Sequence, residues 1–247
     1  MNIKWNAEEY TDSFQFVHQY GESVTELLTV PAGSYVIDLG CGNGALTEKL
    51  KEKGYQVRGL DASADMLEQA RGLHPDISFE QADAVSFTLD KQADAIFSNA
   101  AFHWIDDQEK LLSNLAANIR TGGELVFEFG GKGCAETVHS ELEKAFGRRG
   151  LVYPRTFYFP TIGEYAPLLE KHGFRVEYAV LFDRFTEQKN RLREWIHMFN
   201  IQAFKEVPQT EWEEIIREAE ENCRERLYVD GKWYVDYVRI RMRARRL

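Results

Sequence analysis

The sequence predicts an α/β protein with a doubly wound, seven-stranded and mostly parallel sheet, and three observations support this fold class. An apolar strand at 34–38 leads into a loop with three alternating glycines, and a helical segment follows. From there to residue 129, short apolar strands alternate with amphipathic segments, which is typical of a parallel sheet with helices on both faces. Near the C-terminus, an Asp230-Gly231 turn between two strand-like segments predicts a hairpin, and so an antiparallel strand at the end of the sheet.

The individual elements follow from apolar periodicity and from residues that start or stop helices. Pro31 ends the first helical segment, Ser63 can cap a later one, and Pro208 separates the last two. The predicted strands are 34–38, 55–60, 77–80, 93–98, 124–129, 174–185 and 232–243. The predicted helical segments are 6–29, 45–53, 64–71, 107–119, 134–146, 162–172, 188–203 and 209–226.

The length suits one domain, 1–247, with a sizeable core. Residues 1–30 are predicted to form lead-in helices ahead of the sheet. Two further segments, 131–173 and 186–228, break the regular alternation of strand and helix. We expect them to be insertions that form a helical cap over the substrate site.

Composition limits the classes of partner. The net charge of −10 disfavours a broad contact with nucleic acid, because the phosphate backbone is itself anionic. The three cysteines lack the spacing of a zinc site or of a disulfide framework, so no metal is predicted. The first residues lack an apolar leader, and no apolar run approaches the ~20 residues that span a bilayer. We therefore expect a cytoplasmic protein without a membrane or nucleic-acid partner, and its oligomeric state stays open.

The loop after the first strand is the strongest functional signal. Asp38 is followed by Gly40, Gly42 and Gly44, and residues without a Cβ allow positive φ and let a ligand approach the backbone. A helix begins just after the loop, and its free N–H groups can hold a phosphate or a carboxylate. The pattern alone leaves two cofactor classes open, because Gly40, Gly42 and Ala45 also satisfy the loose dinucleotide-binding fingerprint.

The ends of the next three strands add the chemistry of a nucleoside site. In an open parallel sheet, ligands bind across the carboxyl ends of the strands. Asp61 ends the second strand and is placed to accept hydrogen bonds from two ribose hydroxyls. Asp83 follows the third strand between two alanines, which favours an exocyclic amino group beside a flat purine ring. The fourth strand leads into the polar and aromatic segment 98–104, where a reaction can take place.

Together these motifs, which run in order from about Val36 to Phe129, resemble the class I S-adenosylmethionine-dependent methyltransferases. The resemblance implies a Rossmann-like methyltransferase fold with S-adenosylmethionine as cofactor. It also implies that the glycine loop passes the methionyl group, that Asp61 holds the ribose and that Asp83 binds the adenine amino group. The residues that it assigns to the cofactor site are Tyr10, Gln15, Asp38, Gly40, Cys41, Gly42, Gly44, Asp61, Ala62, Met66, Asp83, Ala84 and Asn99.

Three shorter segments resemble one branch of this family in particular. Residues 5–10, 99–104 and 233–237 are similar to segments of trans-aconitate methyltransferases and related small-carboxylate O-methyltransferases. By this analogy Tyr10, with nearby Gln15, closes over the methionyl end of the cofactor.

The chemistry of the acceptor decides what the protein has to supply. A sulfonium methyl is already activated, so the acceptor atom has chiefly to be held about 3 Å from it, with water excluded. A carboxylate attacks without a base, whereas a phenol or an ammonium group must lose a proton, for which His103 is the candidate. Phe102, Trp104 and Tyr153 are the predicted walls of the substrate pocket. The candidates for holding an anionic acceptor are Arg148, Arg149, Arg155, Arg184, Arg191 and Arg193.

Each assignment has a structural alternative. Asp61 can be a helix cap, Asp83 a residue of a solvated loop, and Met66 a core residue. His103 can be a packed imidazole rather than a base. Four arginines at alternating positions, 239 to 245, share one face of the last strand, and we interpret them as a solvated edge that discourages strand pairing.

The predicted function is therefore methyl transfer from S-adenosylmethionine to a small-molecule acceptor, with a carboxylate oxygen as one candidate. Phenols, amines and macromolecules are other acceptors for the same chemistry, and a macromolecule is disfavoured by the acidic charge and the helical cap. A nicotinamide-dependent oxidoreductase is an alternative enzyme class, but it leaves Asp38 and the loop at Asp83 unexplained. A non-catalytic cofactor-binding module is a third alternative.

Overall fold

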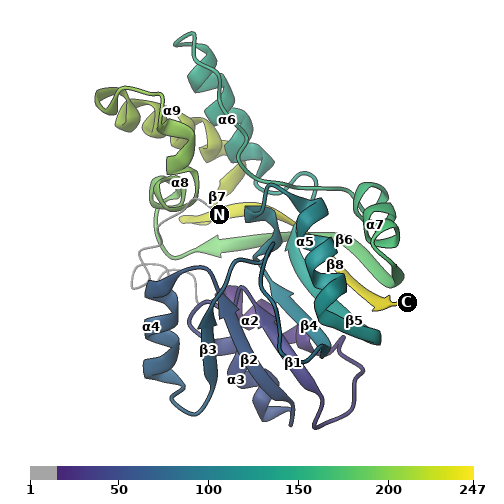
Figure 1. Ribbon diagram of the computed structural model, residues 1–247. Helices are drawn as coiled ribbons and strands as arrows, with labels where there is room; N and C mark the ends of the chain where they lie inside the picture. Colours follow the sequence, from purple (N-terminus) through teal and green to yellow (C-terminus); the bar gives the residue numbers. More distant parts are fainter. Residues whose placement is uncertain (1–15) are drawn as a thin grey trace.

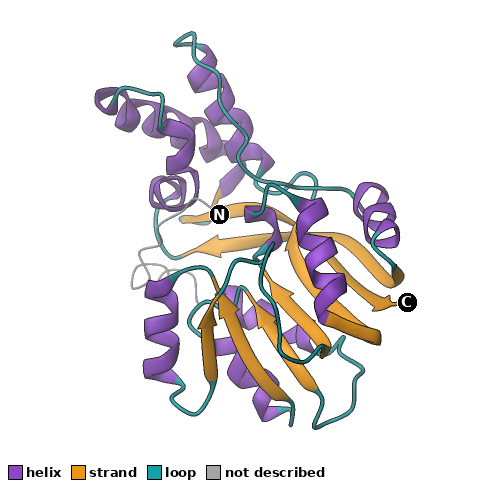
Figure 2. Ribbon diagram, viewed as in Figure 1, coloured by secondary structure: helices purple, strands orange, loops and turns teal. Residues whose placement is uncertain are grey.

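One mixed sheet organises the fold (Figures 1 and 2). The computed structural model describes residues 16–247, with side chains from residue 20 onwards. In that part of the chain the strand order is β3-β2-β1-β4-β5-β8-β6, and the short β7 pairs with β8. The strands are β1 Tyr35–Leu39, β2 Gln56–Asp61, β3 Ser78–Gln81, β4 Ala93–Asn99, β5 Ile119–Gly130, β6 Phe174–Gln188, β7 Tyr228–Val229 and β8 Lys232–Arg246.

The direction of the strands agrees with the predicted fold class. Strands β1 to β5 pair in parallel, whereas β8 runs antiparallel to β5, β6 and β7. The turn between β7 and β8 contains Asp230 and Gly231, both at positive φ, as the hairpin prediction requires. The doubly wound α/β fold with an antiparallel C-terminal strand is thus confirmed.

Helices cover both faces of this sheet. Ser63 caps α4, since its hydroxyl accepts a hydrogen bond of 3.3 Å from the backbone N–H of Met66. The described helices are α2 Phe16–Thr25, α3 Ala45–Glu52, α4 Ala64–Leu73, α5 Gln108–Asn118, α6 Glu136–Gly147, α7 Ile162–Lys171, α8 Leu192–Asn200 and α9 Gln209–Leu227, with the short 3-10 helices η1 Phe102–Trp104 and η2 Ile201–Phe204. Of the predicted lead-in helices, residues 1–15 lie outside the described part.

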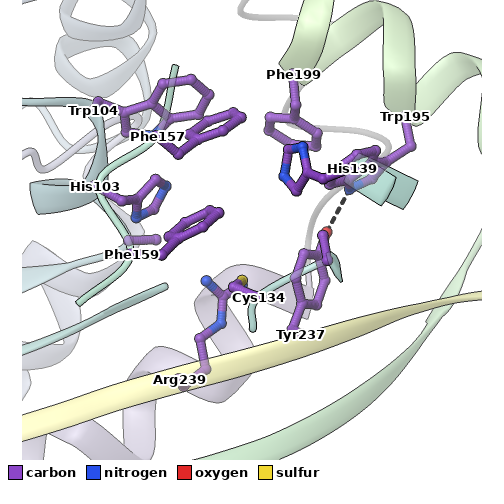
Figure 3. A pocket seen from close by; sticks show the side chains of 12 residues that line it. His103, Trp104, Cys134, His139, Phe157, Phe159, Trp195, Phe199, Tyr237 and Arg239 are labelled. Carbon is purple, nitrogen blue, oxygen red and sulfur yellow. Dashed lines mark hydrogen bonds between the residues drawn. The ribbon is translucent and has the colours of Figure 1, made fainter. Parts of the chain in front are cut away.

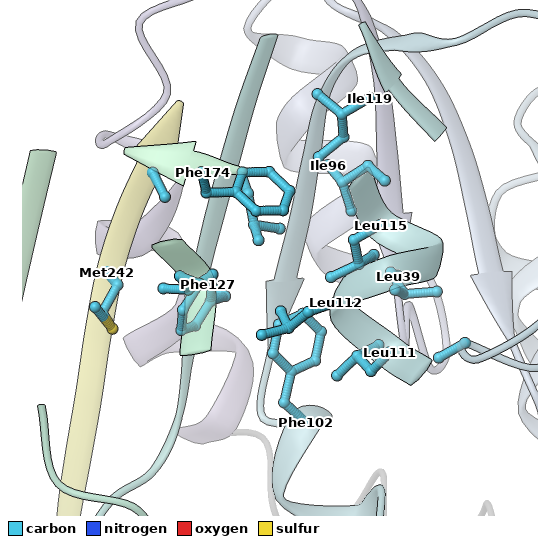
Figure 4. Packing of buried hydrophobic residues seen from close by; sticks show 14 of the residues in the cluster. Leu39, Ile96, Phe102, Leu111, Leu112, Leu115, Ile119, Phe127, Phe174 and Met242 are labelled. Atoms are coloured by element: carbon cyan, nitrogen blue, oxygen red, sulfur yellow. The ribbon is translucent and has the colours of Figure 1, made fainter. Parts of the chain in front are cut away.

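Alternation along the strands directs apolar side chains to two separate cores. Val36 and Phe97 pack with residues of α2 and α3 on one face. Ile37, Ile96 and Phe127 belong to the core on the other face, which α5 and α7 cover with their own buried residues (Figure 4). The two cores pack the parallel strands from both faces, and the carboxyl ends of these strands meet at one edge of the sheet.

The helices α6, α8 and α9 form a third cluster at one end of the sheet (Figure 1). Their apolar side chains pack around the first half of β8, which carries Trp233, Val235 and Tyr237. This part of β8 pairs with β6 but extends beyond β5, whose last paired residue is Gly130. Helix α7 belongs to the segment 131–173, which we expected to be part of the cap. It packs against the sheet beside α5 instead.

The prediction that the alternating arginines form a solvated edge is wrong. Strand β8 lies inside the sheet, between β5 and β6. Arg241 pairs with Glu128 at 2.7 Å and Arg245 with Glu124 at 3.1 Å, and these glutamates are only 3% and 1% exposed in their side chains. Alternation predicts which face the guanidinium groups share, but the acidic neighbours on β5 become visible only once the strands are paired.

No helix among the described residues has both the length and the apolar character to cross a bilayer.

Candidate active site

The glycine loop joins β1 to α3 at the carboxyl edge of the sheet. Gly40, Gly42 and Gly44 all have positive φ, at 76°, 55° and 84°. A Cβ added at Gly40 would lie 2.5 Å from the Cβ of Ala101, because the loop passes close to the chain that leaves β4. A Cβ added at Gly42 would meet only one described atom within 4 Å, the Met66 Cε at 3.1 Å. The backbone at Gly42 is therefore not covered by packed side chains of the described residues, which fits a bound cofactor.

Asp61 fixes the second strand end beside this loop. Its Oδ2 accepts a hydrogen bond of 2.9 Å from the N–H of Gly42, and its Oδ1 accepts one of 2.8 Å from the N–H of Ser63. Burial raises the pKa of this carboxyl group, while the backbone hydrogen bonds act in the opposite direction. The carboxylate is thus held in one orientation, and each oxygen keeps acceptor capacity for a ligand hydroxyl.

Asp83 lies close to Asp61 in the fold. Strands β2 and β3 pair so that Asp61 is opposite Gln81, and the Asp61 carbonyl accepts a hydrogen bond of 2.9 Å from the N–H of Ala82. Asp83 is exposed, and its Oδ1 accepts a bond of 3.1 Å from the N–H of Val85. The two acidic residues predicted for a nucleoside therefore flank the same edge of the sheet.

Asp38 has a different environment from these two. It is buried beneath the loop and accepts a hydrogen bond of 2.6 Å from the Thr47 hydroxyl, which ties β1 to α3. Burial raises the pKa of Asp38 to about 7. Tyr10 and Gln15 lie outside the described residues. The remaining predicted cofactor residues are buried or half-buried: Cys41, Ala62, Met66, Ala84 and Asn99.

A cavity with aromatic walls begins one residue before Ala101, the residue that approaches Gly40 of the loop (Figure 3). It begins at Ala100, which follows β4 and takes the unusual φ of 57°, and its empty volume including the mouth is about 470 Å³. The lining residues are Ala100, His103, Trp104, Cys134, Ala135, His139, Phe157, Phe159, Trp195, Phe199, Tyr237 and Arg239.

The aromatic side chains form flat walls on two sides of this cavity. Phe157 and Phe159 stack with ring centroids 5.3 Å apart and planes 6° apart. Trp104 meets Phe157 edge-on at 4.6 Å. On the other side, Trp195 and Phe199 come from α8, in the segment predicted as a cap. Such walls favour a planar ligand and exclude water from its surroundings.

His103 is held as a neutral imidazole. The N–H of Gly130 donates to its Nδ1 at 3.4 Å, so a neutral ring carries its hydrogen on Nε2. Burial, with a smaller contribution from the positive charge of Arg239, lowers the pKa of His103 well below 6.5. In this state His103 offers a hydrogen-bond donor at Nε2 rather than a basic lone pair.

Arg239 brings a buried positive charge to the cavity. It is 8% exposed, and its guanidinium carbon lies 4.4 Å from the centroid of the Tyr237 ring. Among the described residues, none is a hydrogen-bond partner for its Nε and none forms an ion pair with it. The strand register gives the reason: Arg241 is opposite Glu128 on β5, whereas Arg239 is opposite Gly130. A buried charge without a partner is costly, so an anionic ligand would be strongly favoured here.

Comparison with known proteins identifies the family. A sequence model described as a methyltransferase domain matches residues 37–127. An uncharacterized methyltransferase of Schizosaccharomyces pombe is 31% identical over 258 residues, which cover 97% of each chain. The chain belongs to the S-adenosylmethionine-dependent methyltransferases.

Further relatives and solved structures agree with this family. A trans-aconitate 2-methyltransferase of Rhodopseudomonas palustris is 38% identical over 129 residues, about half of each chain. One of an Azoarcus species is 28% identical over 82% of each chain. The crystal structure of a putative methyltransferase from Bacillus halodurans has a TM-score of 0.67 at 17% identity, and covers 92% of this chain and 98% of that one. This last likeness supports the fold.

The cations predicted to hold an anionic acceptor in the methyltransferase already have acidic partners. Arg184 binds Glu128 through both terminal nitrogens, and Arg191 and Arg193 share Glu220. Arg148 and Arg149 pair with Glu218, and Arg155 pairs with Glu136 and Glu143. None of these six arginines lines the aromatic cavity. Sequence reasoning did not include Arg239 among the candidate cations, although the alternation along β8 predicts on which face of the sheet this arginine lies.

Two of the predicted pocket residues take other positions. Phe102 is 1% exposed and packs in the core against Phe127 and Phe129, with centroids 5.2 and 5.7 Å away. Tyr153 is buried too, and its hydroxyl bonds to the Nδ1 of His139, which itself lines the cavity. Neither Phe102 nor Tyr153 therefore lines this cavity, since the chain turns both side chains inward at these points. Trp104 does line it, and His139 was missed because nothing near it in the sequence marks a site.

Proposed function

We propose that this methyltransferase transfers the methyl group of S-adenosylmethionine to a carboxylate oxygen of a small molecule. One observation carries the proposal: the buried guanidinium of Arg239, which has no ion-pair partner among the described residues, lies in an aromatic cavity beside the cofactor loop. A carboxylate fits such a group best, because it accepts two parallel hydrogen bonds from a guanidinium.

The positions of the residues indicate which part of the cofactor each of them would contact. The open backbone at Gly42 would face the methionyl part, and the fixed carboxylate of Asp61 would bind the ribose hydroxyls. Met66 and Ala84 would lie against the adenine ring, with Asp83 near its amino group. S-adenosylmethionine supplies a methyl on a sulfonium, so its transfer breaks the C–S bond, leaves the electron pair on sulfur and converts an anionic carboxylate into a neutral ester.

At the acceptor end, no base is required. Arg239 would pair with the carboxylate and orient it, while the Nε2–H of His103 would donate a further hydrogen bond. His103, predicted as a base, would then be a donor that helps to position the acceptor. The rings of Trp104, Phe157 and Phe159 would keep water away from the reacting atoms.

The names of two relatives support the same acceptor class. Trans-aconitate 2-methyltransferases, to which this chain is similar, act by their name on a carboxylate compound. The small cavity and its helical surroundings favour a free small molecule over a macromolecule.

The test measures product formation with a panel of small carboxylates, phenols and amines. We expect S-adenosylhomocysteine and a methyl ester, both detected by mass spectrometry, with at least one carboxylate. Arg239→Gln should lower kcat/KM by at least about 30-fold, or about 2 kcal/mol, while Arg217→Gln on the surface of α9 should not. Turnover of a phenol or an amine with no carboxylate accepted would contradict the proposal.

A further inference from the structure

A second histidine of the cavity wall has the opposite hydrogen-bonding state from His103. His139, on α6, is 2% exposed, and its Nδ1 lies 2.7 Å from the hydroxyl of Tyr153. That hydroxyl donates its only hydrogen to the Oδ1 of Asn200, at 2.9 Å. With the Asn200 amide oriented in this way, the Tyr153 oxygen accepts from His139, so the neutral ring carries its hydrogen on Nδ1 and a lone pair on Nε2.

No group of the described residues donates a hydrogen bond to this lone pair. The Nε2 of His139 is buried and has no hydrogen-bond partner among the described residues. Figure 3 shows the outer edge of the ring directed toward the space between Phe157 and Phe199. Burial lowers the pKa of His139 to about 4, so the ring stays neutral and keeps its lone pair at neutral pH. Because a buried acceptor without a donor is unfavourable, this position favours a ligand that brings a hydrogen-bond donor.

Three of the polar groups that line the cavity bear on the choice of ligand, and the Tyr237 hydroxyl, which accepts a hydrogen bond of 2.6 Å from the Nε1 of Trp195, belongs to the same wall. Arg239 and the Nε2–H of His103 are donors suited to a carboxylate, whereas the Nε2 of His139 can only accept. A second carboxylate at His139 would meet a lone pair and aromatic rings. The cations Lys132 and Arg155 line a second cavity, together with Glu136. This second cavity shares His139 and the two stacked phenylalanines with the aromatic cavity.

On the basis of the proposed function, we infer that the acceptor is a flat molecule with one carboxylate and a separate hydrogen-bond donor, such as a hydroxyl, which His139 recognises through Nε2. His139 is then a specificity-determining residue, and Tyr153 is a positioning residue that fixes its tautomer. A tricarboxylate such as trans-aconitate lacks this match, because an additional anionic group beside the Nε2 of His139 would meet a lone pair and not a donor.

The experiment compares matched ligands. Binding of cinnamate and of its 2-, 3- and 4-hydroxy derivatives is measured by calorimetry with S-adenosylhomocysteine bound to the full chain, and trans-aconitate is measured alongside. We expect at least one hydroxycinnamate to bind at least 10-fold more tightly than cinnamate, and trans-aconitate to bind more weakly than either. His139→Leu should reduce the hydroxyl preference to less than 2-fold, whereas His139→Gln, whose side-chain oxygen can also accept, should restore part of it.

Two further measurements separate the possible failures. Affinity for S-adenosylhomocysteine should be the same in all variants, which shows that they fold. In the wild-type protein, ¹⁵N NMR of the histidine rings should give the Nδ1–H tautomer for His139 and the Nε2–H tautomer for His103, and Tyr153→Phe should alter only the former. Equal binding of all cinnamates, or a preference that survives in His139→Leu, would overturn this inference alone. Binding of no carboxylate would overturn the proposed function as well.

Discussion

The carboxylate of Asp61 accepts a hydrogen bond of 2.9 Å from the backbone N–H of Gly42. This bond joins the end of β2 to the loop that follows β1, although the two residues are nineteen positions apart in the chain. The residue expected to hold the ribose therefore also shapes the loop expected to hold the methionyl group. We therefore expect that binding of the ribose and binding of the methionyl group are coupled through this one side chain.

Asp61→Ala should weaken binding of S-adenosylhomocysteine by at least about 10-fold, or about 1.4 kcal/mol. The change removes the acceptor for the ribose and releases the N–H groups of Gly42 and Ser63. Calorimetry measures the affinity, and Asp65→Ala in the exposed first turn of α4 is the control, with no expected change. An unaltered affinity in Asp61→Ala would refute the ribose role.

Gly40→Ala should destabilise the protein more than Gly33→Ala. Both glycines have similar positive φ, 76° and 84°, so both substitutions impose backbone strain of about 1 kcal/mol or more. Only at Gly40 would the new methyl group meet another atom within 4 Å, the Cβ of Ala101 at 2.5 Å. Urea unfolding should give an additional loss of about 1–3 kcal/mol at Gly40. Equal losses at the two positions would mean that the loop and the end of β4 can move apart freely.

Glu128→Gln should cost about 3 kcal/mol or more of unfolding free energy. Glu128 is the buried partner of both Arg184 and Arg241, whose side chains are only 11% and 14% exposed. Its neutralisation leaves two guanidinium groups without a compensating charge. The surface pair of Arg217 and Glu221 provides the comparison, and Glu221→Gln should cost less than about 1 kcal/mol. The idea of a structural charge cluster fails if denaturant unfolding gives similar values for both variants.

Asp38 should make the protein less stable as pH rises from about 4 to about 7. Burial raises its pKa in the folded state from 3.8 to about 7, so between these values the folded state binds the proton and the unfolded state has lost it. The penalty is absent below pH 4, and it reaches at most about 4 kcal/mol above pH 7. Asp38→Asn should remove this part of the pH dependence. We would measure urea unfolding of both proteins at pH 5 and pH 8; parallel pH profiles would exclude the effect.

The position of the acidic strand ends beside the glycine loop could be predicted, because it depends on the order of the strands. Each strand of a parallel sheet ends at the same edge, so Asp61 and Asp83 had to lie near the glycine loop once the strands were recognised. The same reasoning does not give the side-chain directions of Phe102 and Tyr153, which do not line the aromatic cavity. Both follow strand ends or loops near the site, but side-chain direction at such points is set by packing, and both turn into the protein interior.

The sequence by itself determined the order of strands and helices, the glycine loop, the acidic strand ends and the shared face of the arginines on β8. It could not determine their neighbours, because these come from strand pairing between distant segments. The register with β5 puts Glu128 opposite Arg241 and Gly130 opposite Arg239. Arg241 thereby gained an acidic partner, and Arg239 became a buried charge in the cavity. Only the tertiary structure decided this, since the cost of burying a charge depends on the groups that the fold brings to it.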